Sequence, residues 1–327
     1  MRLLITGGTG FFGRALLKQL ALLQPGSITC PYSRVTVVTR RPEAFKERHP
    51  TLARLPWLNL YPGDVTDIDS LKNLAAEIPY DALLHAAADS TDSAELTPLR
   101  RLDQIVNGTR NMLEFAVMHS TPRFLLTSSG GVYGPQSVGL PEIPETYCGM
   151  PDPLLASSTY GIAKRHAEHL CSLYSQAYGL ESVIARCFAF VGEDLPMNAH
   201  FAVGNFIRDA LYRPQIDVQG NGSPIRSYMH QADLANWLLT LLRAGRSGHA
   251  YNVGSDQAIS IADLARCVRD VVSPEKAVHI HGEGLIDNAQ RSRYIPSIAK
   301  AQTELGLELT VDLREAIRLT ARNCTHG

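Results

Sequence analysis

The sequence lacks a cysteine framework, a long apolar run and a strong charge excess. Its six cysteines are scattered, with no CxxC pair and no metal-ligand spacing, so we expect no metal site and a reducing, cytoplasmic compartment. No stretch reaches the roughly 18 apolar residues of a membrane span. The formal net charge of -1 gives no electrostatic footprint for nucleic acid or for a membrane surface. An anionic ligand would therefore be held by local arginines.

What is present is a regular alternation of strand and helix signals. At 327 residues the chain can form one large α/β domain with an appended lobe. Short apolar runs alternate with amphipathic segments, which predicts a doubly wound parallel sheet at residues 1–190, covered by helices on both faces. Prolines and glycines interrupt the chain after Gly192. Residues 191–327 are therefore expected to form mainly a smaller α/β lobe, with helices near Phe206–Leu211 and Asp233–Leu242 and some chain returning to the sheet. The expected strands are Leu3–Thr6, Val35–Thr39, Leu58–Tyr61, Ala82–His85, Phe124–Ser128 and Ser182–Arg186.

A glycine-rich turn separates the first expected strand from the first expected helix. The segment TGGTGFFG carries Gly7, Gly10 and Gly13, and Phe11 and Phe12 lie between the last two glycines. Glycines at this spacing allow a tight turn and let a pyrophosphate approach the helix N-terminus, whose N–H groups favour an anion. The context of strand, turn and helix predicts a dinucleotide site, and the alternative is a tight turn without a ligand.

The residues after the second and third expected strands bear on which dinucleotide binds. Thr39 is followed by Arg40, and an arginine here suits a ribose 2′-phosphate, whereas an acidic residue would bind a free 2′-hydroxyl. We therefore expect NADP(H) in preference to NAD(H), although exposed arginines after a strand are also common. Asp64, which precedes Val65, is expected to accept from the adenine amino group or to form an Asx-type turn.

A tyrosine and a lysine at helical spacing predict acid/base chemistry. Tyr160 and Lys164 are four residues apart and would share one face of a helix. A nearby positive charge favours phenolate, so a tyrosine with a pKa drawn toward neutrality can exchange a proton with an alcohol while hydride moves. Ser129 ends the fifth expected strand, at the edge where α/β sheets bind ligands, and can hydrogen-bond the same oxygen.

On these residues the chain resembles the extended short-chain dehydrogenase/reductases, in their nucleotide-sugar epimerase, dehydratase and ketoreductase branch. The matching motifs are TGGTGFFG, GDVTD, HAAA, SSGGVYG, YGIAK, IRSYMHQADLA, YNVGS and RSRYIPSIAKAQTELGL. The resemblance implies a Rossmann-like NAD(P)-binding domain, a homodimer, and a catalytic set of Ser129, Tyr160 and Lys164. The residues expected at the cofactor are Gly7, Gly10, Phe11, Phe12, Gly13, Thr39, Arg40, Asp64, Val65, Ala86, Ala87, Tyr160 and Lys164.

The same resemblance implies a nucleotide-diphosphate sugar as substrate. Two arginines of the nucleotide-sugar relatives clamp the diphosphate, and they fall here on Arg226 and Arg293, with Arg291 close by. Guanidinium forks match phosphate oxygens, which makes this assignment physically sound. Ser129 and Gly130 are expected to border the sugar. The alternative for each arginine is an ordinary ion pair with a surface carboxylate.

The glycine pair after Ser129 bears on the reaction. The hexose 4,6-dehydratases place Asp-Glu at this point, where this chain has Gly130 and Gly131. Dehydration needs an acid/base pair that glycines cannot supply, whereas room above the sugar suits a ketone that rotates or enters for reduction. We therefore expect a 4-ketoreductase or 4-epimerase, Arg40 favouring the former. A 4,6-dehydratase remains the alternative, with Glu142 or Glu145 as the substitute carboxylate.

Two other classes of function stay open. A non-sugar alcohol or ketone oxidoreductase of this fold would not need Arg226 and Arg293. A non-catalytic cofactor-sensing protein would not need Tyr160. Of the histidines near the expected cleft, His200 is expected to pack in the core, while His230 is expected either to contact substrate phosphate or to pack.

Overall fold

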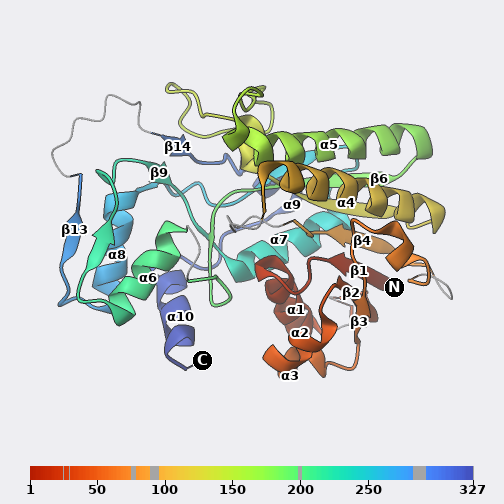
Figure 1. Ribbon diagram of the computed structural model, residues 1–327, viewed down its shortest axis with the longest axis horizontal. Helices are drawn as coiled ribbons and strands as arrows, with labels where there is room; N and C mark the ends of the chain where they lie inside the picture. The colour runs from red at the N-terminus through yellow and green to blue at the C-terminus, as the bar shows by residue number, and fades with distance from the viewer. Residues whose placement is uncertain are drawn as a thin grey trace.

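A seven-stranded parallel sheet forms the centre of the molecule (Figure 1). The computed structural model describes residues 1–24, 26–28, 30–74, 79–88, 96–197, 201–282 and 292–326. The strand order is β11-β6-β5-β4-β1-β2-β3. The strands are β1 (Arg2–Thr6), β2 (Arg34–Thr39), β3 (Leu58–Pro62), β4 (Ala82–His85), β5 (Arg123–Ser129), β6 (Glu181–Cys187) and β11 (Ala250–Val253). The predicted doubly wound α/β fold is confirmed, and the six predicted strands differ from these by at most one residue at either end.

Helices cover both faces of the sheet because the central strands are apolar on both sides. On β1, Leu3 and Ile5 belong to one core cluster and Leu4 belongs to another. The first cluster includes the buried residues of α1 and α7, and the second includes those of α4 and α5. The helices of the two layers are α1 (Phe11–Leu23) and α7 (Gln231–Ala244) on one face, and α4 (Pro98–Met118) and α5 (Thr159–Tyr178) on the other.

The chain returns to the sheet after visiting the smaller lobe. β11 pairs in parallel with β6, and α9 (Ala299–Leu305) packs against β11. The helix expected at Asp233–Leu242 is α7, and it lies on the sheet rather than in the lobe, because its buried face includes Trp237 packed in the sheet's core. A boundary at residue 190 stays a prediction.

The smaller lobe, on the left of Figure 1, has its own apolar core. Helices α6 (Ala202–Tyr212), α8 (Ile261–Val272) and α10 (Leu313–His326) pack together in this lobe, where β8 (Ile216–Val218) pairs in parallel with β13 (Val278–Ile280). Two further small sheets join it to the large one. They are β7 (Phe190–Val191) with β10 (Met229–His230), and β12 (Ile259–Ser260) with β9 (Ile225–Arg226) and β14 (Arg293–Tyr294).

The remaining helical elements are short. They are α2 (Pro42–Arg48), α3 (Pro50–Ala53), and three single turns, η1 (Ile68–Leu71), η2 (Gly130–Tyr133) and η3 (Ala156–Ser158). Among the helices of the described ranges, none has both the length and the apolar character that crossing a bilayer requires.

Candidate active site

The three glycines of the first turn are required for different reasons. Gly7 has φ +71°, and a Cβ there would run into the Ala86 carbonyl, while a Cβ at Gly13 would run into the backbone of Gly8. These two glycines let β1, β4 and α1 pack closely. Gly10 is different, because the nearest described atom to a Cβ there would be the Gly7 carbonyl oxygen, at 3.5 Å. Packing alone does not require glycine at this position, which leaves an open surface for a ligand.

The start of α1 beside Gly10 is suited to an anion. Gly10 is the N-cap and contributes no side-chain cap, and the first turn carries no acidic residue. Phe11 and Phe12 hold this end of the helix in place, since the Phe12 ring lies edge-on to Phe190 with centroids 5.2 Å apart. The backbone N–H groups of the first turn and the helix dipole therefore favour a pyrophosphate here.

The other predicted cofactor residues lie along the same edge of the sheet. Thr39 is buried at the end of β2, whereas Arg40 is exposed. The Asp64 carboxylate accepts from both the N–H (2.9 Å) and the hydroxyl (2.8 Å) of Thr66, which is the Asx-turn alternative. Ala87 follows β4 and donates its N–H to the Thr6 hydroxyl at 3.3 Å. Val65 follows β3 and Ala86 follows β4, so the predicted cofactor residues lie near the carboxyl ends of β1 to β4, and their contact with a dinucleotide stays a prediction.

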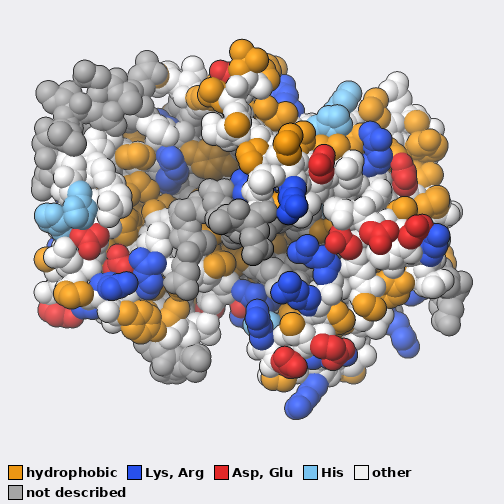
Figure 2. All heavy atoms as spheres, viewed as in Figure 1, with side chains coloured by type: hydrophobic (Ala, Val, Ile, Leu, Met, Phe, Trp, Pro, Cys, Tyr) orange, Lys and Arg blue, Asp and Glu red, His pale blue; other side chains and the backbone are white. Residues whose placement is uncertain are grey.

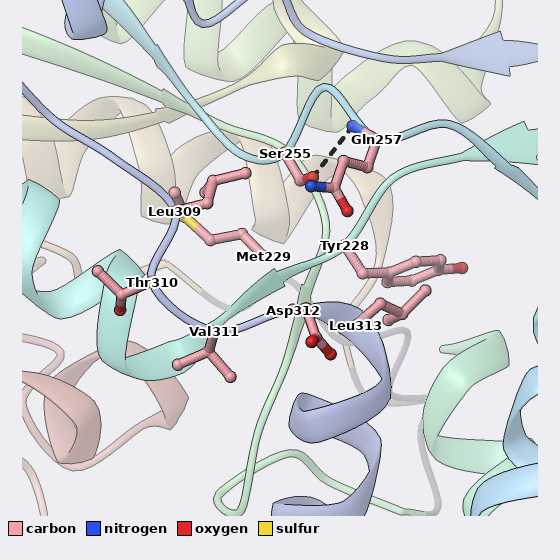
Figure 3. A pocket seen from close by; sticks show the side chains of 9 residues that line it. All are labelled: Tyr228, Met229, Ser255, Gln257, Leu309, Thr310, Val311, Asp312 and Leu313. Carbon is pink, nitrogen blue, oxygen red and sulfur yellow. Dashed lines mark hydrogen bonds between the residues drawn. The ribbon is translucent and has the colours of Figure 1, made fainter.

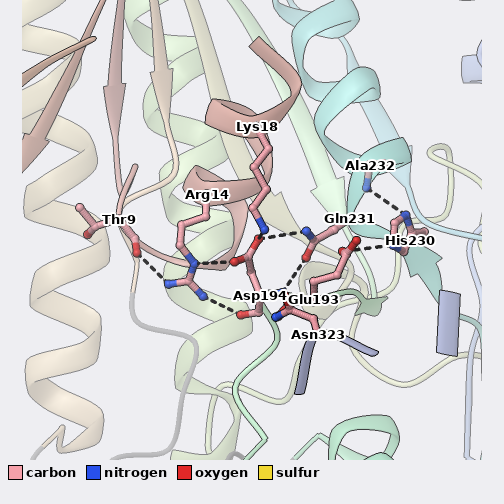
Figure 4. A network of polar contacts seen from close by, with 9 residues as sticks. All are labelled: Thr9, Arg14, Lys18, Glu193, Asp194, His230, Gln231, Ala232 and Asn323. Atoms are coloured by element: carbon pink, nitrogen blue, oxygen red, sulfur yellow. Dashed lines mark hydrogen bonds and ion pairs between the residues drawn. The ribbon is translucent and has the colours of Figure 1, made fainter. Parts of the chain in front are cut away.

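A partly buried polar network joins the glycine turn to the segment after β7 (Figure 4). Arg14 donates to the Thr9 carbonyl (3.1 Å) and to the Asp194 carboxylate (3.0 Å). Lys18 and Gln231 donate to the other carboxylate oxygen of Asp194, at 2.6 and 3.0 Å. Basic side chains gather over α1 near the middle of the face in Figure 2. The glycine turn is thereby fixed to the chain that enters the smaller lobe.

Ser129, Tyr160 and Lys164 come together at the carboxyl end of β5. Ser129 is the last residue of that strand, and its hydroxyl accepts the N–H of Gly131 at 3.1 Å. It also hydrogen-bonds the phenol of Tyr160, in the first turn of α5. The buried Lys164 ammonium lies 6.0 Å from the Tyr160 ring centroid and donates to the Thr127 carbonyl at 2.8 Å.

The protonation of this group differs from the sequence expectation. Burial raises the pKa of Tyr160 to about 12, and the hydrogen bond from Ser129 lowers it only in part. Burial also lowers the pKa of the Lys164 ammonium to about 8. Desolvation therefore decides the direction of the shift, and the pKa of Tyr160 moves away from neutrality rather than toward it.

A second phenol, from Tyr294, reaches Ser129 from the smaller lobe. Ser129 hydrogen-bonds this hydroxyl as well, and the Tyr294 ring packs against Phe188 in a tilted arrangement with centroids 4.6 Å apart. A Cβ on Gly130 would lie 2.5 Å from the Tyr294 hydroxyl oxygen and 2.8 Å from the Phe188 ring. The prediction that Gly130 leaves room above the sugar is therefore wrong on this side, because these two rings fill the space.

The expected arginines are only partly brought to the site. Arg226 pairs with Tyr294 across β9 and β14, so both occupy the same face, and its guanidinium donates to the Ser292 carbonyl at 2.8 Å. Arg293 is on the opposite face of β14 and donates to the Pro141 carbonyl at 3.2 Å. Arg291 lies outside the described residues. The alternation of side chains along the strands places Arg293 and Arg226 on opposite faces of this small sheet. A sequence motif does not reveal this difference.

Two further sequence alternatives receive structural roles. The Glu145 carboxylate accepts from the Asn252 backbone N–H at 2.8 Å. Its hydrogen bond is therefore to β11 and not to Ser129. His230 caps α7 by accepting from the Ala232 N–H at 3.3 Å, and its other ring nitrogen lies 3.4 Å from Glu193. Capping α7 accounts for one ring nitrogen of His230, and a contact with substrate phosphate stays a prediction. His200 lies outside the described residues.

Neither of two cavities in the described part of the chain is lined by Ser129, Tyr160 or Lys164. The smaller, of about 160 Å³, is lined by Tyr228, Met229, Ser255, Gln257, Leu309, Thr310, Val311, Asp312 and Leu313 (Figure 3). The larger, of about 420 Å³, lies beside a buried ion pair between Glu168 and Arg186, which are 2.8 Å apart. The candidate site is therefore identified by its converging side chains and not by either of these two cavities.

Comparison with known proteins places the chain in a family. It matches the NAD dependent epimerase/dehydratase family over residues 3–254. UDP-glucuronic acid decarboxylase 1 of Xenopus tropicalis is 31% identical over 320 residues, which span 98% of this chain and 71% of that protein. UDP-glucuronic acid decarboxylase 3 of Arabidopsis thaliana is 30% identical over 320 residues, or 98% of this chain and 87% of that protein. The solved UDP-glucuronic acid 4-epimerase of Bacillus cereus, in complex with NAD, has the same fold, with a TM-score of 0.81 at 21% identity, covering 100% of this chain and 97% of that one.

The prediction of NADP(H) is wrong. The Bacillus cereus epimerase holds NAD, and two further solved neighbours were also determined with NAD. The prediction rested on Arg40, which is exposed after β2, and an exposed arginine needs no phosphate partner. The chain belongs to the NAD dependent epimerase/dehydratase family, in the nucleotide-sugar branch of the extended short-chain dehydrogenase/reductases, and is an enzyme of that type.

Proposed function

We propose that this enzyme binds NAD and a UDP-sugar and modifies the sugar through transient oxidation at C4, with no net change in the cofactor. The observation that carries the proposal is the convergence of Ser129, Tyr160 and Lys164 at the edge that also carries Gly10. The relatives at 30 and 31% identity, which are UDP-glucuronic acid decarboxylases, suggest a UDP-hexuronate as the substrate. A reductase was favoured over an epimerase because Arg40 predicted the use of NADPH, and that cofactor prediction is wrong.

Each residue of the site has a defined task in this proposal. Tyr160 takes the proton of the C4 hydroxyl, and Ser129 hydrogen-bonds the same oxygen. Lys164 lies behind the Tyr160 ring, where its charge favours the phenolate form and its ammonium can also hydrogen-bond a ribose hydroxyl. NAD supplies the acceptor for the C4 hydride. Its positive charge would offset the burial that raises the pKa of Tyr160 to about 12.

Decarboxylation is the outcome that the surroundings of Ser129 favour. A uronate oxidised at C4 is a β-keto acid, which loses carbon dioxide by itself once its carboxylate is correctly oriented. The C5–C6 bond breaks, and its electrons form the C4 enolate. This step needs no general base, and the described side chains that meet Ser129 are phenols rather than carboxylates. Rotation of the ketone, as in 4-epimerisation, would need space that Tyr294 and Phe188 fill beside Gly130.

Incubation of the purified protein with UDP-glucuronic acid, UDP-glucose and UDP-galactose tests the proposal. We expect UDP-glucuronic acid to become a UDP-pentose with release of carbon dioxide and no consumption of added NAD. Products are identified by NMR and mass spectrometry. Interconversion of UDP-glucose and UDP-galactose with UDP-glucuronic acid left intact would instead establish an epimerase. A 4-keto-6-deoxy product would establish a dehydratase, and stoichiometric oxidation of NADH or NADPH a reductase.

A further inference from the structure

The site contains a third hydroxyl that the catalytic set does not include. Tyr294 belongs to β14, far along the chain from Ser129 and Tyr160, and its phenol lies beside Ser129. Two contacts fix the ring and its hydroxyl: the Phe188 ring packs against it in a tilted arrangement with centroids 4.6 Å apart, and Gly130 leaves space for the hydroxyl where a Cβ would collide with it. A hydroxyl fixed this closely has a defined direction.

The position of Tyr294 follows from the pairing of two strands far apart in sequence. β14 runs parallel to β9, and Tyr294 is the partner of Arg226, whereas Arg293 is the partner of Ile225. Alternation along a strand therefore turns Tyr294 and Arg226 toward Ser129, and Arg293 away from it. A phenol with a guanidinium beside it therefore lies next to Gly130. The hexose 4,6-dehydratases have a carboxylate at this position.

We propose that Tyr294 is a catalytic residue that donates the proton to C5 of the sugar after carbon dioxide has left. This inference rests on the proposed decarboxylation. Loss of carbon dioxide leaves an enolate across C4 and C5. The electron pair of that enolate takes the proton of the Tyr294 hydroxyl at C5, and the C4 ketone is restored. The hydride then returns to C4, and O4 recovers its proton from Tyr160.

The proton balance of the turnover is complete. Tyr160 takes one proton from O4 and returns it, so it contributes none overall. The proton that replaces the carboxylate comes from Tyr294, which recovers it from water before the next turnover. Between these events the Tyr294 phenolate is stabilised by the Ser129 hydroxyl and by the Arg226 charge, both of which favour the charged form.

The chemistry of a buried phenol suits this task. Burial raises the pKa of Tyr294 above its ordinary value, so the group keeps its proton at neutral pH and does not compete with Tyr160 as a base. An enolate carbon is basic enough to take a proton from a phenol in contact with it. A carboxylate at the same place would be deprotonated at neutral pH and would repel the leaving carboxylate of the substrate.

The variant Tyr294→Phe tests the proposal, because it retains the ring that packs against Phe188 and removes only the hydroxyl. In single turnovers with UDP-glucuronic acid, we expect the rate at which bound NAD is reduced to stay within about threefold of wild type. Formation of the UDP-pentose should fall by about 100-fold, with the reduced cofactor and the 4-keto pentose accumulating. The control is Tyr80→Phe. Tyr80 is another buried tyrosine, and its hydroxyl donates to the Leu74 carbonyl at 3.2 Å. It lies just before β4, at the amino end of that strand and away from Ser129.

A second readout follows the proton itself. In deuterated water, NMR of the wild-type product should show deuterium at C5 on a single face, and the product of Tyr294→Phe should show it on both faces. Equal slowing of NAD reduction and product formation would overturn the proposal, since Tyr294 would then only position Ser129. A wild-type rate of single-face deuteration in the variant would also overturn it. Wild-type protein that releases no carbon dioxide would refute the proposed function, and this inference with it.

Discussion

The guanidinium of Arg14 holds Asp194 by both its side chain and its backbone. Its Nε lies 3.0 Å from the carboxylate, and its Nη2 lies 2.6 Å from the Asp194 carbonyl oxygen. The same side chain reaches back to the Thr9 carbonyl in the glycine turn. One arginine therefore links the glycine turn to the chain that enters the smaller lobe.

We expect Asp194→Asn to weaken both the fold and NAD binding. Asp194 is mostly buried between two cations, and its loss leaves Arg14 and Lys18 without their anionic partner, at a cost of about 2 to 3 kcal/mol. The midpoint of thermal unfolding should fall, and the dissociation constant for NAD should rise severalfold because Thr9 is released. Calorimetry measures both. The control is Asp270→Asn, an exposed ion pair with Arg269, and equal effects in the two variants would contradict the link.

The variant Tyr160→Phe should lose turnover while keeping its cofactor. Removing the hydroxyl removes the proton acceptor for O4, so kcat should drop by about 10² to 10⁴. NAD content and the unfolding midpoint should stay near wild type, because the ring remains packed. Tyr178→Phe, at the exposed end of the same helix, is the matched control. Retention of full turnover in Tyr160→Phe would remove this residue from the mechanism.

The variant Gly130→Ala tests the close packing over Ser129. The added Cβ would lie 2.5 Å from the Tyr294 hydroxyl oxygen, so the rings must shift, at a cost of about 1 to 3 kcal/mol. Turnover should fall as well. Gly139→Ala is the control, because no described atom lies within 4 Å of a Cβ there. Thermal unfolding and product formation are compared for the two variants. A Gly130→Ala protein as stable and active as Gly139→Ala would show that the space is open.

His85 should make the protein less stable in mild acid. Burial lowers the pKa of His85 to about 3, and its ring contacts the hydroxyls of Thr6 (2.7 Å) and Thr109 (3.3 Å). Between about pH 6.5 and 3 the unfolded chain binds a proton that the folded chain excludes, so stability falls as the pH is lowered through this window.

At pH 5 this loss amounts to about 2 kcal/mol relative to pH 7. His85→Gln should be less stable than wild type at pH 7 but should lose less on acidification, as measured by urea unfolding at the two pH values. His169→Gln, which changes an exposed histidine, should keep the wild-type pH dependence. A parallel pH dependence for wild type and His85→Gln would contradict the assignment.

The sheet and the glycine turn could be predicted because their causes are local. A strand buried on both faces must be a continuous apolar run, and a turn before a helix N-terminus needs glycine. The pairing of Tyr160 with Lys164 is equally local, since helical spacing alone puts them on one face. Their pKa values could not be predicted, because desolvation depends on the whole surrounding fold.

Tyr294 was missed for a different reason. In the sequence, the arginines of the segment RSRYIP are the candidate diphosphate ligands. β14 is only two residues long, and its register against β9 decides which side chain faces the site. That register is a tertiary property. It selects Tyr294 and excludes Arg293, although the two are adjacent in the sequence.

A chain cut after residue 190 would end the sheet at β6. β11, which supplies the backbone partners of Ile184 to Cys187, would be absent, as would Trp237 on α7. The cut would expose an unpaired row of N–H and C=O groups along β6, beside an uncovered apolar face. Such an edge pairs readily with other chains. An isolated cofactor-binding fragment of this enzyme should therefore aggregate, and the dinucleotide site should form only when the later strand is present.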